Sequence, residues 1–173
     1  MALAFSAEAQ RKIEDIKRQY PTTQAACLPV LHLAQDELGH LSDDAIELVA
    51  NTLDLPRAHV FGVATFYTMY HRKPVGKRVL MMCTNISCML TGGYDTLKAL
   101  EQQLGVKAGE TTADGEFTLI EEECLAACAD APAMICGPRY FLRLTPDKVG
   151  QALAECRKMP AEHGHHGSEG SKK

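Results

Sequence analysis

Two close pairs of cysteines constrain this chain more than any other feature of its sequence. Four residues separate Cys83 from Cys88, three separate Cys124 from Cys128, and 35 lie between the pairs. The seven cysteines of this 173-residue chain are an odd number, which fits a framework made only of disulfides poorly. In a reducing cytosol, paired cysteines are more often metal ligands or catalytic thiols than disulfides. We therefore expect the four paired thiols to share one site.

The residues before the first pair predict a small helical bundle. Ser6 and Ser42 each precede an apolar stripe of helical spacing and are expected N-caps. Pro56 is expected to begin a later helix that continues to about Tyr70, because proline suits the first helical position. Four helices with short connections favour a bundle over residues 1–73.

The last predicted helix of the bundle carries several large apolar side chains, namely Phe61, Phe66, Tyr67 and Met69. Their spacing favours packing in the bundle's own core. The alternative is that they are apolar anchors for a partner protein. The basic stretch 71–77, which contains proline and glycine, is expected to be a linker, with its cations near a helix C-terminus.

After the linker the pattern becomes that of a compact α/β domain over residues 74–159. The expected order is strand, helix, strand, strand, strand, helix, at residues 78–83, 90–104, 117–120, 133–136, 140–144 and from 146 onward. If the first two strands are parallel neighbours, both cysteine pairs lie at one edge of the sheet, where ligands gather in open α/β sheets. Residues 160–173 are rich in Gly, Ser, His and charge, and are expected to be disordered.

The spacing within the cysteine pairs favours a [2Fe–2S] cluster over zinc. Zinc sites made of four cysteines usually have two residues between paired ligands, whereas wider loops suit a larger centre with two metal atoms. A zinc-stabilised interaction module therefore stays open as an alternative, as do four unrelated structural thiols. The remaining cysteines, Cys27, Cys136 and Cys156, lie in apolar segments and are expected to be buried packing residues without a ligand role.

The residues around the paired thiols carry a family resemblance. The segments are ATFYTMY (64–70), KPVG (73–76), CTNISCMLTG (83–92) and ECLAACADAP (123–132). They resemble the E-subunit family of bacterial NADH:quinone oxidoreductase (respiratory complex I), which includes matching subunits of NAD-linked hydrogenases and formate dehydrogenases. The resemblance extends over nearly the whole chain and implies a helical N-terminal region followed by a thioredoxin-like α/β domain with one [2Fe–2S] cluster.

The resemblance also implies the ligands and the partner. The family's ligands match Cys83, Cys88, Cys124 and Cys128. The chain would exchange single electrons with the FMN of a flavoprotein subunit that binds NADH, within an arm of further peripheral subunits. Related alternatives are a diaphorase subunit of an NAD-linked hydrogenase or formate dehydrogenase, and a free-standing thioredoxin-like ferredoxin. Ala126 stands where many members have glycine, and Pro132 resembles the cis proline of thioredoxin folds.

Other classes of function fit the sequence poorly. A net charge of −4 argues against a nucleic-acid binder, and no apolar run is long enough to cross a membrane. No glycine-rich nucleotide motif is present, so NADH and flavin are expected on a partner. The expected location is cytoplasmic, on the inner face of the cell membrane within a membrane-bound complex. The glutamates at 121–123 predict a low cluster potential, because uncompensated negative charge disfavours reduction.

Overall fold

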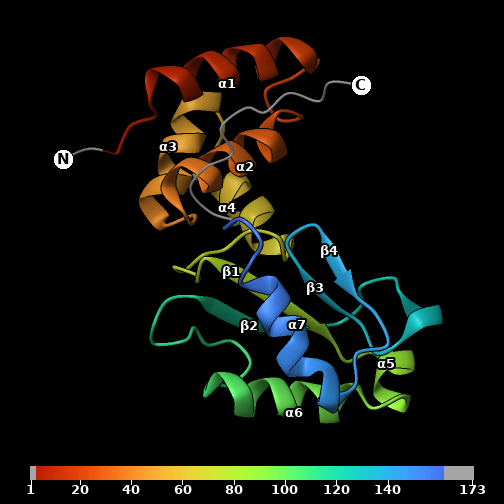
Figure 1. Cartoon of the computed structure of the whole chain (residues 1–173). Coiled ribbons are helices and arrows are strands. Elements are labelled where there is room, and N and C mark those ends of the chain that lie inside the picture. The colour runs from red at the N-terminus through yellow and green to blue at the C-terminus, as the bar shows by residue number, and fades with distance from the viewer. Residues whose placement is uncertain (1–2, 162–173) are drawn as a thin grey trace, which may run out of the picture. The chain divides into compact units, whose positions relative to one another are not determined.

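The computed structural model describes residues 3–161, which divide into two units at residues 3–74 and 75–161 (Figure 1). Each unit has a buried apolar core of its own. The expected division into 1–73 and 74–159 stays a prediction, and the tail expected at 160–173 lies almost wholly outside the described residues. Among the helices of the described chain, none has the length and apolar character that crossing a membrane requires.

Four helices make up the first unit, as the sequence predicts. They are α1 (Ala7–Gln19), α2 (Cys27–Leu38), α3 (Asp43–Leu53) and α4 (Arg57–Phe66). The Ser6 hydroxyl accepts the Ala9 N–H at 3.1 Å, and the Ser42 hydroxyl accepts the Ala45 N–H at 3.2 Å, which confirms both N-caps. Pro56 is the N-cap of α4 rather than its first helical residue.

Helix α4 is shorter than the sequence predicts, because it ends at Phe66 and not near Tyr70. Tyr70 is buried, and its hydroxyl donates to the carbonyl of Leu28 at 2.9 Å. The side chain of Gln35 donates to the carbonyl of Met69 at 3.0 Å. These bonds to α2 hold residues 69 and 70 outside the helical path, so the chain leaves the helix earlier than its apolar periodicity indicates.

The prediction that the aromatic side chains of α4 pack in the core is wrong. Phe61, Phe66 and Tyr67 are all exposed, and only Met69 of the four predicted residues packs against the core. Phe66 and Tyr67 stand where the helix ends, and their rings meet edge to face. The guanidinium of Arg72 lies over the Phe61 ring, 5.1 Å from its centre, in a cation–π contact.

The first residues of the predicted linker belong to the helical unit. His71 is buried; its N–H donates to Gln35 Oε1 at 2.6 Å and its carbonyl accepts the Leu41 N–H at 2.7 Å. Arg72 forms an ion pair with Asp43 at 2.7 Å, in the first turn of α3. The sequence predicts that the cations of this stretch lie near the C-terminus of a helix. They do not lie at the end of α4, because that helix ends five residues before His71.

The second unit is an α/β domain with the predicted order of elements. Its strands are β1 (Arg78–Cys83), β2 (Phe117–Glu122), β3 (Met134–Cys136) and β4 (Arg139–Phe141), and its helices are α5 (Ile86–Leu90), α6 (Gly93–Leu104) and α7 (Val149–Cys156), with short 3₁₀ turns η1 (Cys128–Asp130) and η2 (Pro146–Lys148). The sheet order is β2-β1-β3-β4. Strands β1 and β2 are parallel, which meets the condition stated in the sequence analysis, and the other neighbours are antiparallel. The Ala131–Pro132 bond is cis, also as predicted.

The core of this unit lies between one face of the sheet and the pair α6 and α7 (Figure 1). Side chains two residues apart on each strand point into it, as the two-residue period of a strand requires. Its fully buried large members are Leu80, Met82, Leu100, Phe117, Leu119 and Met134. The core thus holds β1 and β2 rigidly beside each other, with their C-terminal ends at the same edge.

The helix predicted at 90–104 begins three residues later, and a short helix that the sequence does not predict precedes it. Helix α5 ends at Leu90, and α6 begins only at Gly93. Gly92, between them, has a φ of +99°, which a residue with a side chain rarely adopts. The break separates the short segment that carries Cys88 from the longer core helix.

Candidate functional site

The four paired cysteines lie where β1 and β2 end. Cys83 is the last residue of β1 and pairs with Glu122, the last residue of β2. Cys88 lies in α5, Cys124 follows β2, and Cys128 begins η1. Parallel pairing of the two strands therefore delivers both cysteine loops to the same edge of the sheet, as the sequence predicts.

The two members of the first pair are in contact inside the protein. Cys83 and Cys88 are buried and share a small cluster with Leu125 and Ala133. Their thiols are hydrogen-bonded to each other, and a negative charge on Cys128 would act on Cys88. Cys124 and Cys128 are exposed. Within residues 3–161, no three His, Cys, Asp or Glu side chains are close enough together to hold one metal ion.

The electrostatics of Cys88 fit a site that takes up positive charge. Burial raises the pKa of the Cys88 thiol to about 11, helped by the hydrogen bond to Cys83 and by the charges of Cys83 and Cys128. The Ala133 N–H acts in the opposite direction. A thiolate here needs a cation beside it, and a coordinating metal ion removes the thiol proton outright. Four cysteine sulfurs are the donor set that an iron–sulfur cluster requires.

Gly93 allows the first cysteine loop to lie flat against the start of α6. A Cβ at this position would lie 2.7 Å from the Cys88 carbonyl oxygen and 3.2 Å from that of Cys83. Both contacts are with backbone, which cannot rotate away. Gly93 is thus a functional residue that the ligand motif does not include, and the double glycine after the second cysteine is its only signal in the sequence.

Ala126 shapes the second cysteine loop. Its φ is +56°, in the left-handed region, and its N–H donates to Cys124 Sγ at 3.4 Å. Glycine adopts this conformation more easily than alanine does. The geometry gives a physical reason for the glycine that many members of the resembling family have at this position.

Acidic side chains surround the ends of the strands. The Thr84 hydroxyl donates to the Glu121 carboxylate at 2.8 Å, and the Cys83 thiol approaches the Glu123 carbonyl at 3.7 Å. Beside the second pair, Arg143 donates to the carboxylate of Asp130 at 2.9 Å. This carboxylate neutralises the nearby guanidinium, so the surroundings described here add little net positive charge.

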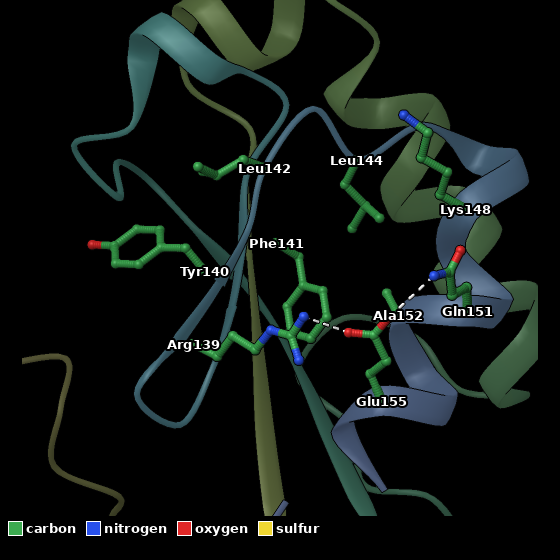
Figure 2. Close-up of a pocket in the computed structure, with 9 residues that line it drawn as sticks. All are labelled: Arg139, Tyr140, Phe141, Leu142, Leu144, Lys148, Gln151, Ala152 and Glu155. Atoms are coloured by element: carbon green, nitrogen blue, oxygen red, sulfur yellow. Dashed lines mark hydrogen bonds and ion pairs between the residues drawn. The ribbon is translucent and has the colours of Figure 1, made fainter. Parts of the chain in front are cut away.

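An apolar surface adjoins Cys88. It consists of the exposed side chains Ile86, Met89 and Leu90 on α5 and Tyr94 at the start of α6, and we call it the α5 patch. Leu90 is 76% exposed. Contiguous apolar patches of this kind often mark interaction sites. The hollow between β4 and α7 shown in Figure 2 is a different place, and none of the four paired cysteines lines it.

The comparison with known families decides the assignment. The family model described as thioredoxin-like [2Fe-2S] ferredoxin matches residues 13–157. The chain belongs to this family. Its cofactor is one [2Fe–2S] cluster, so the preference for this centre over zinc is confirmed. The α/β fold class with a thioredoxin-like domain is confirmed as well.

Members of the family from several bacteria are close in sequence. The chain is 42% identical over 148 residues to the second of the NADH-quinone oxidoreductase E subunits of Rhizobium meliloti, a match that covers 86% of this chain and 88% of that protein. It is 46% identical over 143 residues to the E subunit of the same oxidoreductase from Rickettsia conorii, covering 81% of this chain and 86% of the relative. The predicted resemblance to E subunits is therefore confirmed.

A solved structure shows the same fold in a different protein. The NAD+-reducing [NiFe]-hydrogenase in its air-oxidised state superposes with a TM-score of 0.65 at 19% identity, over 76% of this chain and 23% of the hydrogenase chain. At this identity the likeness concerns the fold alone.

Proposed function

We propose that this chain is the electron-carrying subunit of an NADH-oxidising assembly and that Cys83, Cys88, Cys124 and Cys128 hold its [2Fe–2S] cluster. The observation that carries the proposal is the delivery of two cysteine loops to one edge of the sheet by the parallel pairing of β1 and β2. The names of the E-subunit relatives support the parent assembly. Membership of an oxidoreductase complex supports an oxidoreductase role for the chain.

The chain's own residues would bind, orient and shield the cluster. The rigid ends of β1 and β2 fix the first and third ligands, and Gly93 lets the second ligand lie close to the core. Burial of Cys83 and Cys88 keeps water from that side, while the Ala126 N–H is placed to stabilise the charge on Cys124. When bound, a [2Fe–2S] cluster accepts and releases one electron at a time.

We place NADH and FMN on a partner flavoprotein, with the α5 patch as the surface that meets it. The patch lies beside Cys88, and short distances favour electron transfer between a cluster and an external donor. Other peripheral subunits would complete the assembly and fix it to the inner face of the cell membrane. A diaphorase module of an NAD-linked hydrogenase is the second candidate, because the family that the cysteine motifs resemble includes subunits of such hydrogenases.

The metal assignment is tested on anaerobically purified protein. We expect a brown protein with about two irons per chain and an EPR signal after reduction. Replacing Cys88 with Ser should remove most of the iron, whereas Cys27→Ser should leave it, because Cys27 is buried in the helical unit. A colourless protein that contains zinc, or equal iron in both variants, would contradict the assignment.

The partner surface is tested by co-expression and co-purification with an NADH- and FMN-binding flavoprotein subunit, measured as FMN per chain. Leu90 and Phe66 are equally exposed, at 76% each, and lie in different units. We expect Leu90→Ser to reduce the recovered FMN and Phe66→Ser to leave it unchanged. The opposite result would move the partner to the exposed aromatic side chains of α4.

A further inference from the structure

Two of the three cysteines outside the proposed cluster lie against each other. Cys136 ends β3 and Cys156 ends α7, and both are buried in the core of the second unit. The Cys136 thiol donates a hydrogen bond to the sulfur of Cys156. Residues twenty positions apart in sequence thus form a thiol pair between a strand and a helix.

The surrounding pairing fixes this contact from several sides. Cys136 pairs with Leu80 of β1 and with Arg139 of β4. Arg139 in turn forms an ion pair with Glu155 at 2.5 Å, and Glu155 is the residue before Cys156. The sheet and α7 are therefore locked together at the place where the two sulfur atoms meet.

Two guanidinium groups favour the thiolate of Cys156. The hydrogen bond from Cys136 lowers the pKa of Cys156 most, and the charges of Arg139 and Arg78 lower it further, against the opposing effects of burial and Glu155. Cys27 gives the contrast, since burial alone raises its pKa. A lowered pKa beside cationic groups favours the thiolate, which is the nucleophilic form of cysteine.

The pair is separate from the proposed cluster site. Leu80, which pairs with Cys136, lies three residues before Cys83 on β1, or roughly 10 Å along an extended strand. Cys83 and Cys88 belong to a different apolar cluster from Cys136 and Cys156. The reactivity of the pair can therefore be followed independently of the iron content.

A hollow reaches Arg139 and Glu155, which adjoin the pair, while the two cysteines themselves lie behind its wall. It has a volume of about 220 Å³ and lies between β4 and α7 (Figure 2). The ion pair between Arg139 and Glu155 is part of its wall, together with Ala152 of α7. A molecule the size of hydrogen peroxide, little larger than water, fits such a hollow many times over.

We propose that Cys136 and Cys156 form a thiol–disulfide site that hydrogen peroxide oxidises. The Cys156 thiolate attacks one peroxide oxygen, an S–O bond forms, the O–O bond breaks, and the departing hydroxide takes up a proton as water. The Cys136 sulfur then attacks the sulfenic acid, so that an S–S bond forms and the S–O bond breaks. The leaving hydroxide and the Cys136 proton make a second water. Two thiols lose two electrons and one peroxide gains them. An added dithiol reduces the disulfide back to two thiols and is itself oxidised to a disulfide.

The experiment is peptide mapping of the full-length protein with its cluster, before and after treatment with equimolar peroxide. Free thiols are alkylated, and the protein is cut with trypsin and Asp-N, which places Cys136 alone in peptide 130–139 and Cys156 alone in 149–157. We expect the two peptides to become joined in most chains after treatment and to separate again with dithiothreitol. Iron per chain is measured on the same samples, so that loss of the cluster is seen separately.

Three variants assign the roles. Cys136→Ser should retain a sulfenic acid that dimedone traps at Cys156, whereas Cys156→Ser should leave Cys136 unlabelled. Cys27→Ser, the matched buried control, should form the joined peptide like the wild-type chain. If a serine variant does not fold, the mapping of the wild-type chain still decides. Peptides that stay separate in folded chains, or a joined product that involves Cys27, would overturn the proposal.

Discussion

The tight backbone contact at Gly93 makes Gly93→Ala the sharpest test of how the first cysteine loop is held. The added Cβ would lie 2.7 Å from the Cys88 carbonyl oxygen, far inside normal contact, so the loop must retreat by several tenths of an ångström. Overpacking of this kind costs about 1–3 kcal/mol. Since the displaced carbonyl belongs to a proposed ligand, we also expect the iron content to fall.

Gly62→Ala is the matched control for this exchange. Gly62 lies within α4, and a Cβ there would meet nothing within 4 Å. Alanine in the helix should stabilise the chain by about 0.5–1 kcal/mol. Thermal unfolding and iron analysis of both variants give the readout, with a shift of roughly 2–4 °C per kcal/mol for a chain of this size. A Gly93→Ala protein with full iron and an unchanged Tm would refute the steric argument.

Four further exchanges have defined outcomes. Ala126→Gly should raise the free energy of unfolding by up to about 1 kcal/mol in a denaturant titration, because glycine relieves the left-handed φ; a loss of stability would contradict this. Arg78→Met should cost about 1–3 kcal/mol in the same assay, because the buried guanidinium that bonds to Glu116 and to two backbone carbonyls is lost; wild-type stability would show that these bonds are dispensable. Burial raises the pKa of Cys27 above 9.0, so the thiol ionises first in the unfolded chain as the pH rises. The free energy of unfolding that Cys27 contributes is therefore present below pH 9 and is lost above it. Urea unfolding at pH 8 and pH 10 should show a smaller decrease in this free energy for Cys27→Ser than for the wild-type chain. Glu121→Gln should raise the cluster's midpoint potential in an EPR titration, because one negative charge is removed, while Thr84→Val, which only breaks the hydrogen bond to Glu121, should change it less.

Local chemistry was sufficient to predict much of the fold. Ser6 and Ser42 cap helices because their hydroxyls bond to backbone only three residues away, and such short-range signals are readable in sequence. The order of strands and helices along the chain followed from apolar runs separated by turn signals, and the structure supplies the parallel pairing of β1 and β2 that the sequence analysis took as a condition. The cysteine motif marked the edge of the sheet where the two loops end.

The wrong predictions depended on contacts between residues far apart in sequence. Helix α4 stops early because Tyr70 and Met69 bond to α2, more than 30 residues away, and no local pattern contains that information. The break at Gly92 divided a helix whose leucine spacing is continuous. The need for glycine at position 93 becomes visible only when the backbone that faces it is known.

The role of Arg78 at the beginning of β1 has a practical consequence for shortening this protein. Its guanidinium donates to the carbonyl of Arg157 at 3.0 Å and to that of Met159, just beyond α7. A stop codon placed before position 160 would turn the second acceptor into a terminal carboxylate or delete it, whereas one placed after position 161 spares both. A shortened chain for crystallisation should therefore end after position 161.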